Sequence, residues 1–192
     1  MPLHLFNNSL IVTDNKTLRS SDSVWYHCLY IGPEKLRVAG GPTETDPDSN
    51  TLGGWQLNAA TEYLYSFGLV CSDWDSNSDI LLCVAFEVNV NNEGGNITDT
   101  VDLSLTLWYK GLGEVVSKTQ TIENSVVVGQ SPRYKQFVTT FVIDWDKVDN
   151  VFEPEDILAL RLNLETDSSE VDDIIVNFMS LKYKTTYVKE EV

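Results

Sequence analysis

The chain runs Val101-Asp102-Leu103-Ser104-Leu105-Thr106-Leu107-Trp108-Tyr109 in its most regular stretch. The odd-numbered positions are all apolar, and the even-numbered positions are polar until Trp108. Successive side chains of a β-strand point to opposite faces, so this alternation predicts a strand with one face buried in a core. Trp108 lies on the opposite face, where we expect it to be exposed or to contact another subunit.

The same alternation recurs along the chain, and turn-forming residues follow each run. Residues 156–164 carry leucine at every even position from Leu158, and residues 80–90 begin apolar on both faces. The patterns predict strands at residues 24–30, 63–70, 80–90, 101–109, 114–121, 137–145, 156–164 and 174–187. About eight strands without a convincing helix indicate an all-β, two-sheet antiparallel β-sandwich, which we expect to be jelly-roll-like. Other Greek-key sandwiches share this strand pattern.

The 192 residues fit one domain. Residues 1–23 are polar and mixed, and are expected to form an arm on a neighbour or an edge strand. Residues 24–192 are expected to form the sandwich. Within it, residues 39–54 are rich in Gly, Pro, Asp and Thr and predict a long exposed loop, either a binding loop or a disordered excursion.

The chain is strongly acidic, with 29 Asp and Glu against 13 Lys and Arg and a net charge of −16. Such a surface repels phosphate backbones and anionic lipids, so we expect neither a nucleic acid nor a membrane as partner. No apolar run approaches the roughly 18 residues that span a bilayer. The first residues lack a basic and then apolar signal-peptide pattern, so synthesis in a cytoplasm is expected.

One short acidic segment suggests a metal site. Oxygen-bearing side chains stand at the alternate positions Asp73, Asp75, Asn77 and Asp79, as at the start of a calcium loop. The match then fails, because Ser78 replaces the turn-forming glycine and the bidentate glutamate is absent. The alternative is a loop whose Asp side chains accept hydrogen bonds from nearby backbone N–H groups. We expect no resident cofactor, and keep calcium at these four residues as the lesser alternative.

Five tryptophans raise the possibility of sugar binding. Trp55 follows two glycines and Trp74 lies in the acidic segment, so both are expected outside regular strands. A carbohydrate-binding module would expose both rings near a groove. Exposed aromatic rings stack on sugar rings, while Asp and Asn bind the hydroxyl groups. The alternative is that aromatic side chains fill the core or an interface.

The sequence offers little for catalysis. His27 adjoins Cys28, but neighbouring residues of a strand point to opposite faces and form no catalytic pair. Several acidic clusters lie between the predicted strands, and a glycosidase would need two carboxylates facing across a cleft. We therefore expect a protein that is not an enzyme, with a glycosidase as the third hypothesis.

The order of features resembles the jelly-roll structural proteins of tailed bacteriophage virions, of the head-decoration, head-fibre or tail-fibre type. The segments that carry the resemblance are Asp73 to Ile80, Leu103 to Tyr109, Phe141 to Asp144, Asp156 to Leu162, and the final strand from Asp173 through Val176 to Tyr183.

The resemblance implies a homotrimeric virion component without catalytic residues, made in the host cytoplasm. Its partners would be other virion proteins or a glycan on the host surface. Apolar side chains on nominally outer faces would then contact neighbouring subunits, namely Leu81, Ala85, Trp108, Val138 and Val142. The alternative function is a carbohydrate-binding or adhesion module that uses Trp55 and Trp74.

Overall fold

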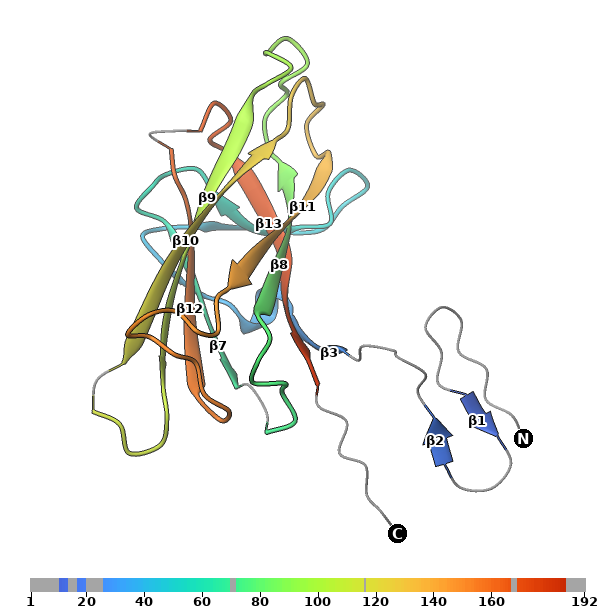
Figure 1. The fold of residues 1–192 in the computed structure, drawn as a ribbon. Coiled ribbons are helices and arrows are strands. Elements are labelled where there is room, and N and C mark those ends of the chain that lie inside the picture. Colours follow the sequence, from blue (N-terminus) through green and yellow to red (C-terminus); the bar gives the residue numbers. More distant parts are fainter. Residues whose placement is uncertain are drawn as a thin grey trace.

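The computed structural model describes residues 11–13, 17–19, 26–69, 72–115, 117–166 and 169–185. Two antiparallel sheets pack face to face as a sandwich (Figure 1). The all-β, jelly-roll-like β-sandwich predicted from the sequence is confirmed, although the two sheets contain 11 strands rather than about eight. The described part of the chain contains no helix with the length and apolar character needed to cross a bilayer.

One sheet has five strands in the order β10-β9-β12-β7-β4. Its strands are β4 (Arg37–Ala39), β7 (Tyr63–Leu69), β9 (Thr100–Lys110), β10 (Lys118–Val127) and β12 (Ile157–Leu164). In Figure 1, β10, β9, β12 and β7 lie on the left of the molecule.

The other sheet has six strands in the order β11-β8-β13-β6-β5, with β3 also paired to the long strand β13. Its strands are β3 (Tyr26–Ile31), β5 (Thr43–Thr45), β6 (Gly54–Leu57), β8 (Ile80–Val88), β11 (Gln136–Ile143) and β13 (Ile174–Lys184). A 3-10 turn, η1 (Pro33–Lys35), follows β3. Strands β1 (Ile11–Thr13) and β2 (Thr17–Arg19) pair with each other. The rest of the expected arm at residues 1–23 lies outside the described residues.

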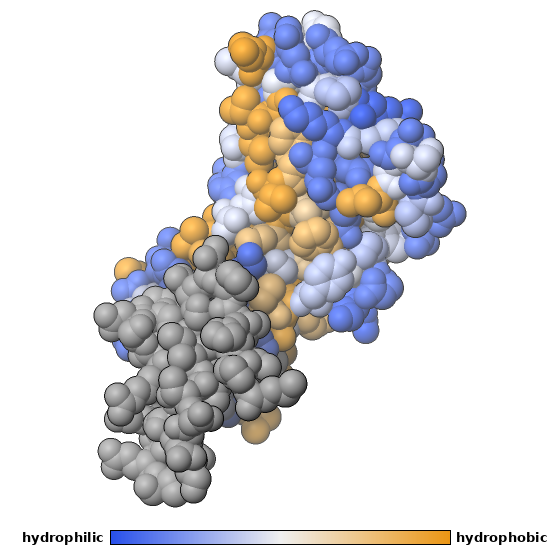
Figure 2. All heavy atoms as spheres, turned by 90° about the vertical axis from the view of Figure 1, so that its right-hand side faces the viewer, coloured by the Kyte–Doolittle hydropathy of each residue, from blue (hydrophilic) through white to orange (hydrophobic). Residues whose placement is uncertain are grey.

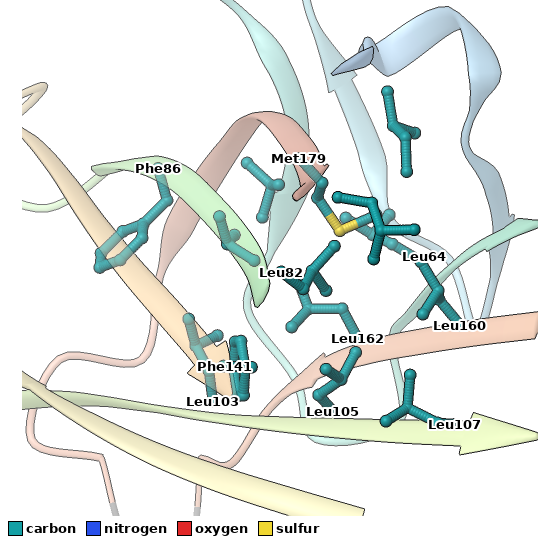
Figure 3. Packing of buried hydrophobic residues seen from close by; sticks show 14 of the residues in the cluster. Leu64, Leu82, Phe86, Leu103, Leu105, Leu107, Phe141, Leu160, Leu162 and Met179 are labelled. Atoms are coloured by element: carbon teal, nitrogen blue, oxygen red, sulfur yellow. The ribbon is translucent and has the colours of Figure 1, made fainter. Parts of the chain in front are cut away.

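The core forms where the inward faces of the two sheets meet. Leucines of β9 and β12 point toward Leu82 and Phe86 of β8 and toward Met179 of β13 (Figure 3). The inward leucines of β9 and β12 are fully buried. Burial of one such side chain contributes roughly 1.5–3 kcal/mol, so the alternating leucines are a main source of stability.

Three of the additional strands are short and lack a clear pattern. Strands β4, β5 and β6 have three, three and four residues, and their side chains do not alternate between buried and exposed. They form because longer neighbours offer free edges, as β7 does for β4 and β13 does for β6. Strand β10 also lies later than the expected 114–121, because it begins at Lys118 and ends at Val127.

The stretch expected as a long exposed loop, residues 39–54, is only partly a loop. It contains β5, and its last residues fold over the outer face of the six-stranded sheet. There the buried carboxylate of Glu87 accepts hydrogen bonds from the Thr51 hydroxyl, at 2.5 Å, and from the Leu52 backbone N–H, at 3.0 Å. Asn177 of β13 donates to the Gly53 carbonyl at 2.8 Å. Residues 51–53 are therefore anchored, while residues 46–50 are exposed.

Candidate ligand-binding face

The structure places the two expected sugar-binding tryptophans apart. Trp74 is only 2% exposed, and its ring packs edge-to-face on Phe152 with the ring centres 5.5 Å apart. The expectation that Trp55 lies outside regular strands is wrong, because Trp55 is part of β6. It is half-buried against the core, and its indole N–H donates to the Pro33 carbonyl at 3.0 Å. Trp55 pairs with Val176 of β13, and Trp74 pairs with Thr185, just beyond the end of β13. These two pairing partners are nine residues apart, or about 30 Å along a strand.

The expectation that Trp74 is exposed is therefore wrong. Its backbone forms an isolated bridge with Thr185, which turns the indole inward to cover one end of the core. Its indole N–H donates to the Ser78 carbonyl at 3.2 Å, so the one polar group of the ring is satisfied. Trp55 and Trp74 do not form one binding site.

The four expected calcium ligands face different partners. The carboxylate of Asp75 lies 2.6 Å from the Lys184 ammonium, whose hydrogen bond holds the pKa of Asp75 below its usual value. Asp73 lies 3.7 Å from His27, and Asp79 accepts a long hydrogen bond, 3.5 Å, from the Trp145 backbone N–H. The exposed Asn77 instead donates its backbone N–H to Asp75. Across the described residues no three His, Cys, Asp or Glu side chains are grouped to hold a metal ion, so calcium here stays a prediction that this geometry does not favour.

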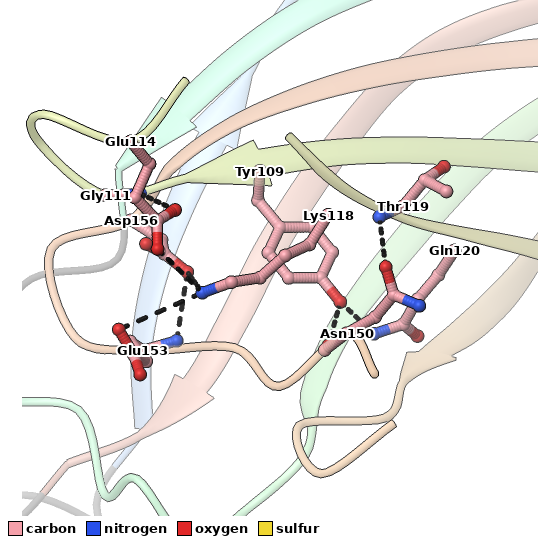
Figure 4. Close-up of polar contacts among 9 residues, drawn as sticks. All are labelled: Tyr109, Gly111, Glu114, Lys118, Thr119, Gln120, Asn150, Glu153 and Asp156. Atoms are coloured by element: carbon pink, nitrogen blue, oxygen red, sulfur yellow. Dashed lines mark hydrogen bonds and ion pairs between the residues drawn. The ribbon is translucent and has the colours of Figure 1, made fainter. Parts of the chain in front are cut away.

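A second acidic group surrounds Lys118 (Figure 4). The Lys118 ammonium lies 3.5 Å from Glu114, 3.8 Å from Glu153 and 3.7 Å from the fully buried Asp156. Burial raises the pKa of Asp156. Burial alone would lower the pKa of Lys118, but the three carboxylates outweigh it and raise that pKa. These carboxylates converge on one lysine and join two loops at the end of the five-stranded sheet.

A different group of side chains gathers on the outer side of the five-stranded sheet, which we call the aromatic face. Its aromatic members are Tyr63, Tyr65 and Phe67 of β7 and Trp108 of β9, and its cationic members are Arg161 of β12 and Arg37 of β4. They point outward because they alternate with core residues such as Leu64, Leu107 and Leu160, which are fully buried.

The strand register places these side chains in rows across the sheet. Ala159 lies between Trp108 and Phe67, and Arg161 lies between Thr106 and Tyr65. In the next row Asn163 lies between Ser104 and Tyr63. Small and hydrogen-bonding side chains therefore fill the space between the aromatic ones.

Arg161 holds the centre of the aromatic face. Its guanidinium carbon lies 5.2 Å from the centre of the Trp108 ring and 5.0 Å from that of Tyr63. One terminal N–H donates to the Thr106 hydroxyl at 3.1 Å, and the buried Nε has no hydrogen-bond partner. At the sheet edge Arg37 lies over Phe67 at 5.5 Å. Neither arginine has a carboxylate within ion-pair distance among the described residues.

Part of the aromatic face is indicated by the sequence. Trp108 breaks the polar side of the alternation, and Tyr63, Tyr65 and Phe67 occupy every second position of one predicted strand. Arg161 is the one cation inside the leucine alternation of residues 156–164. Their convergence depends on the lateral order β9-β12-β7, which residue patterns do not give.

Comparison with known proteins places the chain by fold alone. No family model matches the chain, and no curated protein matches it. Among solved structures, a xylan-binding module CBM15 is similar with a TM-score of 0.50 and 10% identity, over 85% of this chain and 100% of that chain.

Two viral structures are less similar. A structure of infectious bursal disease virus, Gx strain, has a TM-score of 0.44 and 12% identity, over 96% of this chain and 37% of that chain. A domain of tailspike protein 4 of bacteriophage CBA120 has a TM-score of 0.38 and 11% identity, over 81% of this chain and 19% of that chain. The jelly-roll likeness expected from the sequence is shown as a fold, and no phage family is shown at the level of sequence.

Proposed function

We propose that this chain is a non-catalytic carbohydrate-binding module that holds a polysaccharide on the aromatic face. The observation that carries the proposal is the half-buried cluster of Trp108, Tyr63 and Arg161 on an outward sheet surface. Aromatic rings offer flat apolar surfaces to the C–H faces of sugars, and the polar side chains between them can bond hydroxyl groups.

The position of the cluster on strands favours this function. Trp108 and Tyr63 are held by neighbouring strands and by their contacts with Arg161, so their rings lose little freedom when a ligand binds. From β9 to β7 the face spans two strand spacings, or about 10 Å. That width suits a short run of sugar units better than a single sugar.

Xylan is a suitable first ligand, because the similar module CBM15 is described as xylan-binding. Isothermal titration with soluble xylan and a panel of other polysaccharides should reveal binding that Trp108→Ala weakens at least about tenfold, the size expected for a central contact. Tyr26→Ala is the matched control, because Tyr26 is 58% exposed on β3 of the opposite sheet. Failure of the wild-type chain to bind any polysaccharide, or unchanged affinity in Trp108→Ala, would remove the proposed site.

Assembly into a homotrimer, as in a virion structural protein, is the second candidate function. The outer face of the six-stranded sheet carries a band of apolar side chains (Figure 2). Val138 and Val142 of β11 are 61% and 49% exposed, and the half-buried Leu81 and Phe178 continue the band. Of the outer positions first expected to meet a neighbour, Ala85 is instead only 1% exposed, and Trp108 lies on the other sheet.

The band is a suitable contact between copies because few charges lie on it. The net charge of −16 makes most surfaces repel each other, whereas β11 presents only uncharged side chains at Gln136, Val138, Thr140 and Val142. Light scattering of the wild-type protein should then give three times the chain mass of 21.6 kDa. The Val138→Lys variant should give the mass of a single chain. Val127→Lys is the matched control, since Val127 is also 61% exposed but lies on β10. A wild-type monomer at high micromolar concentration would eliminate this candidate.

A further inference from the structure

We infer that the polysaccharide bound by the aromatic face carries carboxylates, as uronic acid units, and that Arg161 and Arg37 bind them. The inference rests on the proposed function and specifies its ligand. Its structural basis is a pair of cations without acidic partners, placed among aromatic rings on one side of an acidic protein.

The charge distribution is the first argument. The chain has 13 basic residues against 29 acidic ones, and two of the described lysines, Lys118 and Lys184, lie 3.5 Å and 2.6 Å from carboxylates. Arg161 and Arg37, by contrast, contact aromatic rings and form no ion pair within the described part of the chain. Arg161 is half-buried whereas Arg37 is exposed. A half-buried cation without a counter-charge is unfavourable, so an anionic ligand would supply the charge that Arg161 lacks.

The chemistry of the guanidinium group is the second argument. The guanidinium group of Arg161 contacts the rings of both Trp108 and Tyr63, which restricts its movement. Within the described residues, the Thr106 hydroxyl is the one acceptor that its N–H groups contact. A planar fork of N–H donors matches the two oxygens of a carboxylate, and such paired bonds are stronger than bonds to neutral hydroxyl groups.

The spacing of the two arginines is the third argument. Tyr65 is the register partner of Arg37 on one side and of Arg161 on the other. The three residues form one row, so the two arginines lie two strand spacings apart, or about 10 Å between their Cα atoms. A polysaccharide that crosses the strands can therefore present separate acidic units to the two arginines while its rings lie over Tyr65 and Phe67.

Carboxylates on the same sheet face restrict where the ligand lies. Glu123 stands on the edge strand β10, at the opposite end from β4 of the row that passes through Tyr63, and this row is next to the row of Arg37. Asp102 of β9 accepts a hydrogen bond from the Ser125 hydroxyl and lies farther along the sheet. The ligand should thus cover β12, β7 and β4. Charges beyond about 8 Å are largely screened at physiological salt, so the net charge of the chain does not prevent binding.

The test compares one polymer in two chemical states. Glucuronoxylan and the same polymer after reduction of its carboxyl groups to alcohols are titrated into the wild-type chain. The acidic polymer should bind about tenfold more tightly, and higher salt should weaken only its binding. Arg161→Gln and Arg37→Gln should reduce the preference, with circular dichroism to check folding.

The possible outcomes separate the inference from the proposed function. Equal affinity for the two polymers would overturn the inference and leave carbohydrate binding intact. No binding to either polymer, or to the wider panel, would remove the proposed function as well. Dextran sulfate tests the nature of the anion: affinity equal to that of glucuronoxylan would mean general attraction of anions and would overturn the assignment of a carboxylate.

Discussion

The guanidinium group of Arg161 lies over the indole ring of Trp108, with its central carbon 5.2 Å from the ring centre. The two residues stand on the adjacent strands β12 and β9, one row apart, and Tyr63 of β7 contacts the guanidinium group at 5.0 Å. One cation therefore links aromatic side chains from both neighbouring strands. These contacts lie on the outer side of the sheet, opposite the core.

A double-mutant cycle tests the link between Arg161 and Trp108. Arg161→Ala, Trp108→Ala and the double variant should show a coupling of about 0.5–2 kcal/mol in the free energy of unfolding, because the cation and the ring are half-buried. Urea denaturation provides the measurement. The pair Arg37 and Trp108, which lies on β4 and β9, is the control and should be additive within about 0.5 kcal/mol. Additivity of the Arg161 and Trp108 changes would show that their contact contributes nothing.

Trp74 should prove to be a core residue. Trp74→Ala removes a ring that is 2% exposed and that packs on Phe152, so it should lower the free energy of unfolding by about 3–5 kcal/mol. Trp74→Phe keeps an aromatic ring but loses the hydrogen bond to Ser78 and should cost less. Trp108→Ala, measured under the same conditions in urea, should cost the least of the three. A loss below about 1 kcal/mol in Trp74→Ala would contradict its burial.

Lys118 should be needed mainly to neutralise Asp156. Lys118→Met leaves a fully buried carboxylate without its cation and should cost about 3 kcal/mol or more at pH 7. The double variant Lys118→Met/Asp156→Asn should regain much of that loss, whereas Lys110→Met, at an exposed lysine of the same sheet, should have little effect. No recovery in the double variant would mean that Lys118 acts through Glu114 or Glu153 instead.

The pH dependence of the same pair follows from the raised pKa of Asp156. Burial raises this pKa above 3.8, so the folded state holds the proton at a pH where the unfolded state has released it. The contribution of Asp156 to the stability of the folded state therefore becomes less favourable as pH rises from 3.8 through the pKa that Asp156 has in the folded state. The cost of Lys118→Met should shrink as pH falls toward 4, measured by urea denaturation across this range. A cost that does not change with pH would contradict a charged Asp156.

The Thr51 hydroxyl should hold the loop before β6 in place. Thr51→Val leaves one oxygen of the buried Glu87 without its donor and removes the acceptor of the Gly53 N–H, so it should cost about 1–3 kcal/mol. Thermolysin should also cleave faster before Leu52, which is 64% exposed. Thr43→Val, at an exposed threonine of β5, is the matched control. Equal cleavage rates in the two variants would show that the loop is held by other contacts.

Sequence alone determined the strands with long alternations. Val101 to Leu107 and Leu158 to Leu164 show which side chains face the core, because the period of two is a local property of a strand. Two sheets must then cover each other to bury these faces, which gives the sandwich. Strands β4, β5 and β6 were missed because they are too short to show a period and form at the edges of longer neighbours.

Only the tertiary structure decided which outward side chains meet. Tyr63, Trp108 and Arg161 come from three separate strands, and they are brought together by the lateral order β9-β12-β7. Trp74 was expected to be exposed, yet its segment folds back beside Thr185 and buries the ring. Both outcomes have one physical reason. A side chain's face within its strand follows from neighbouring residues, but its surroundings depend on long-range pairing that satisfies the backbone and buries the most apolar surface over the whole chain.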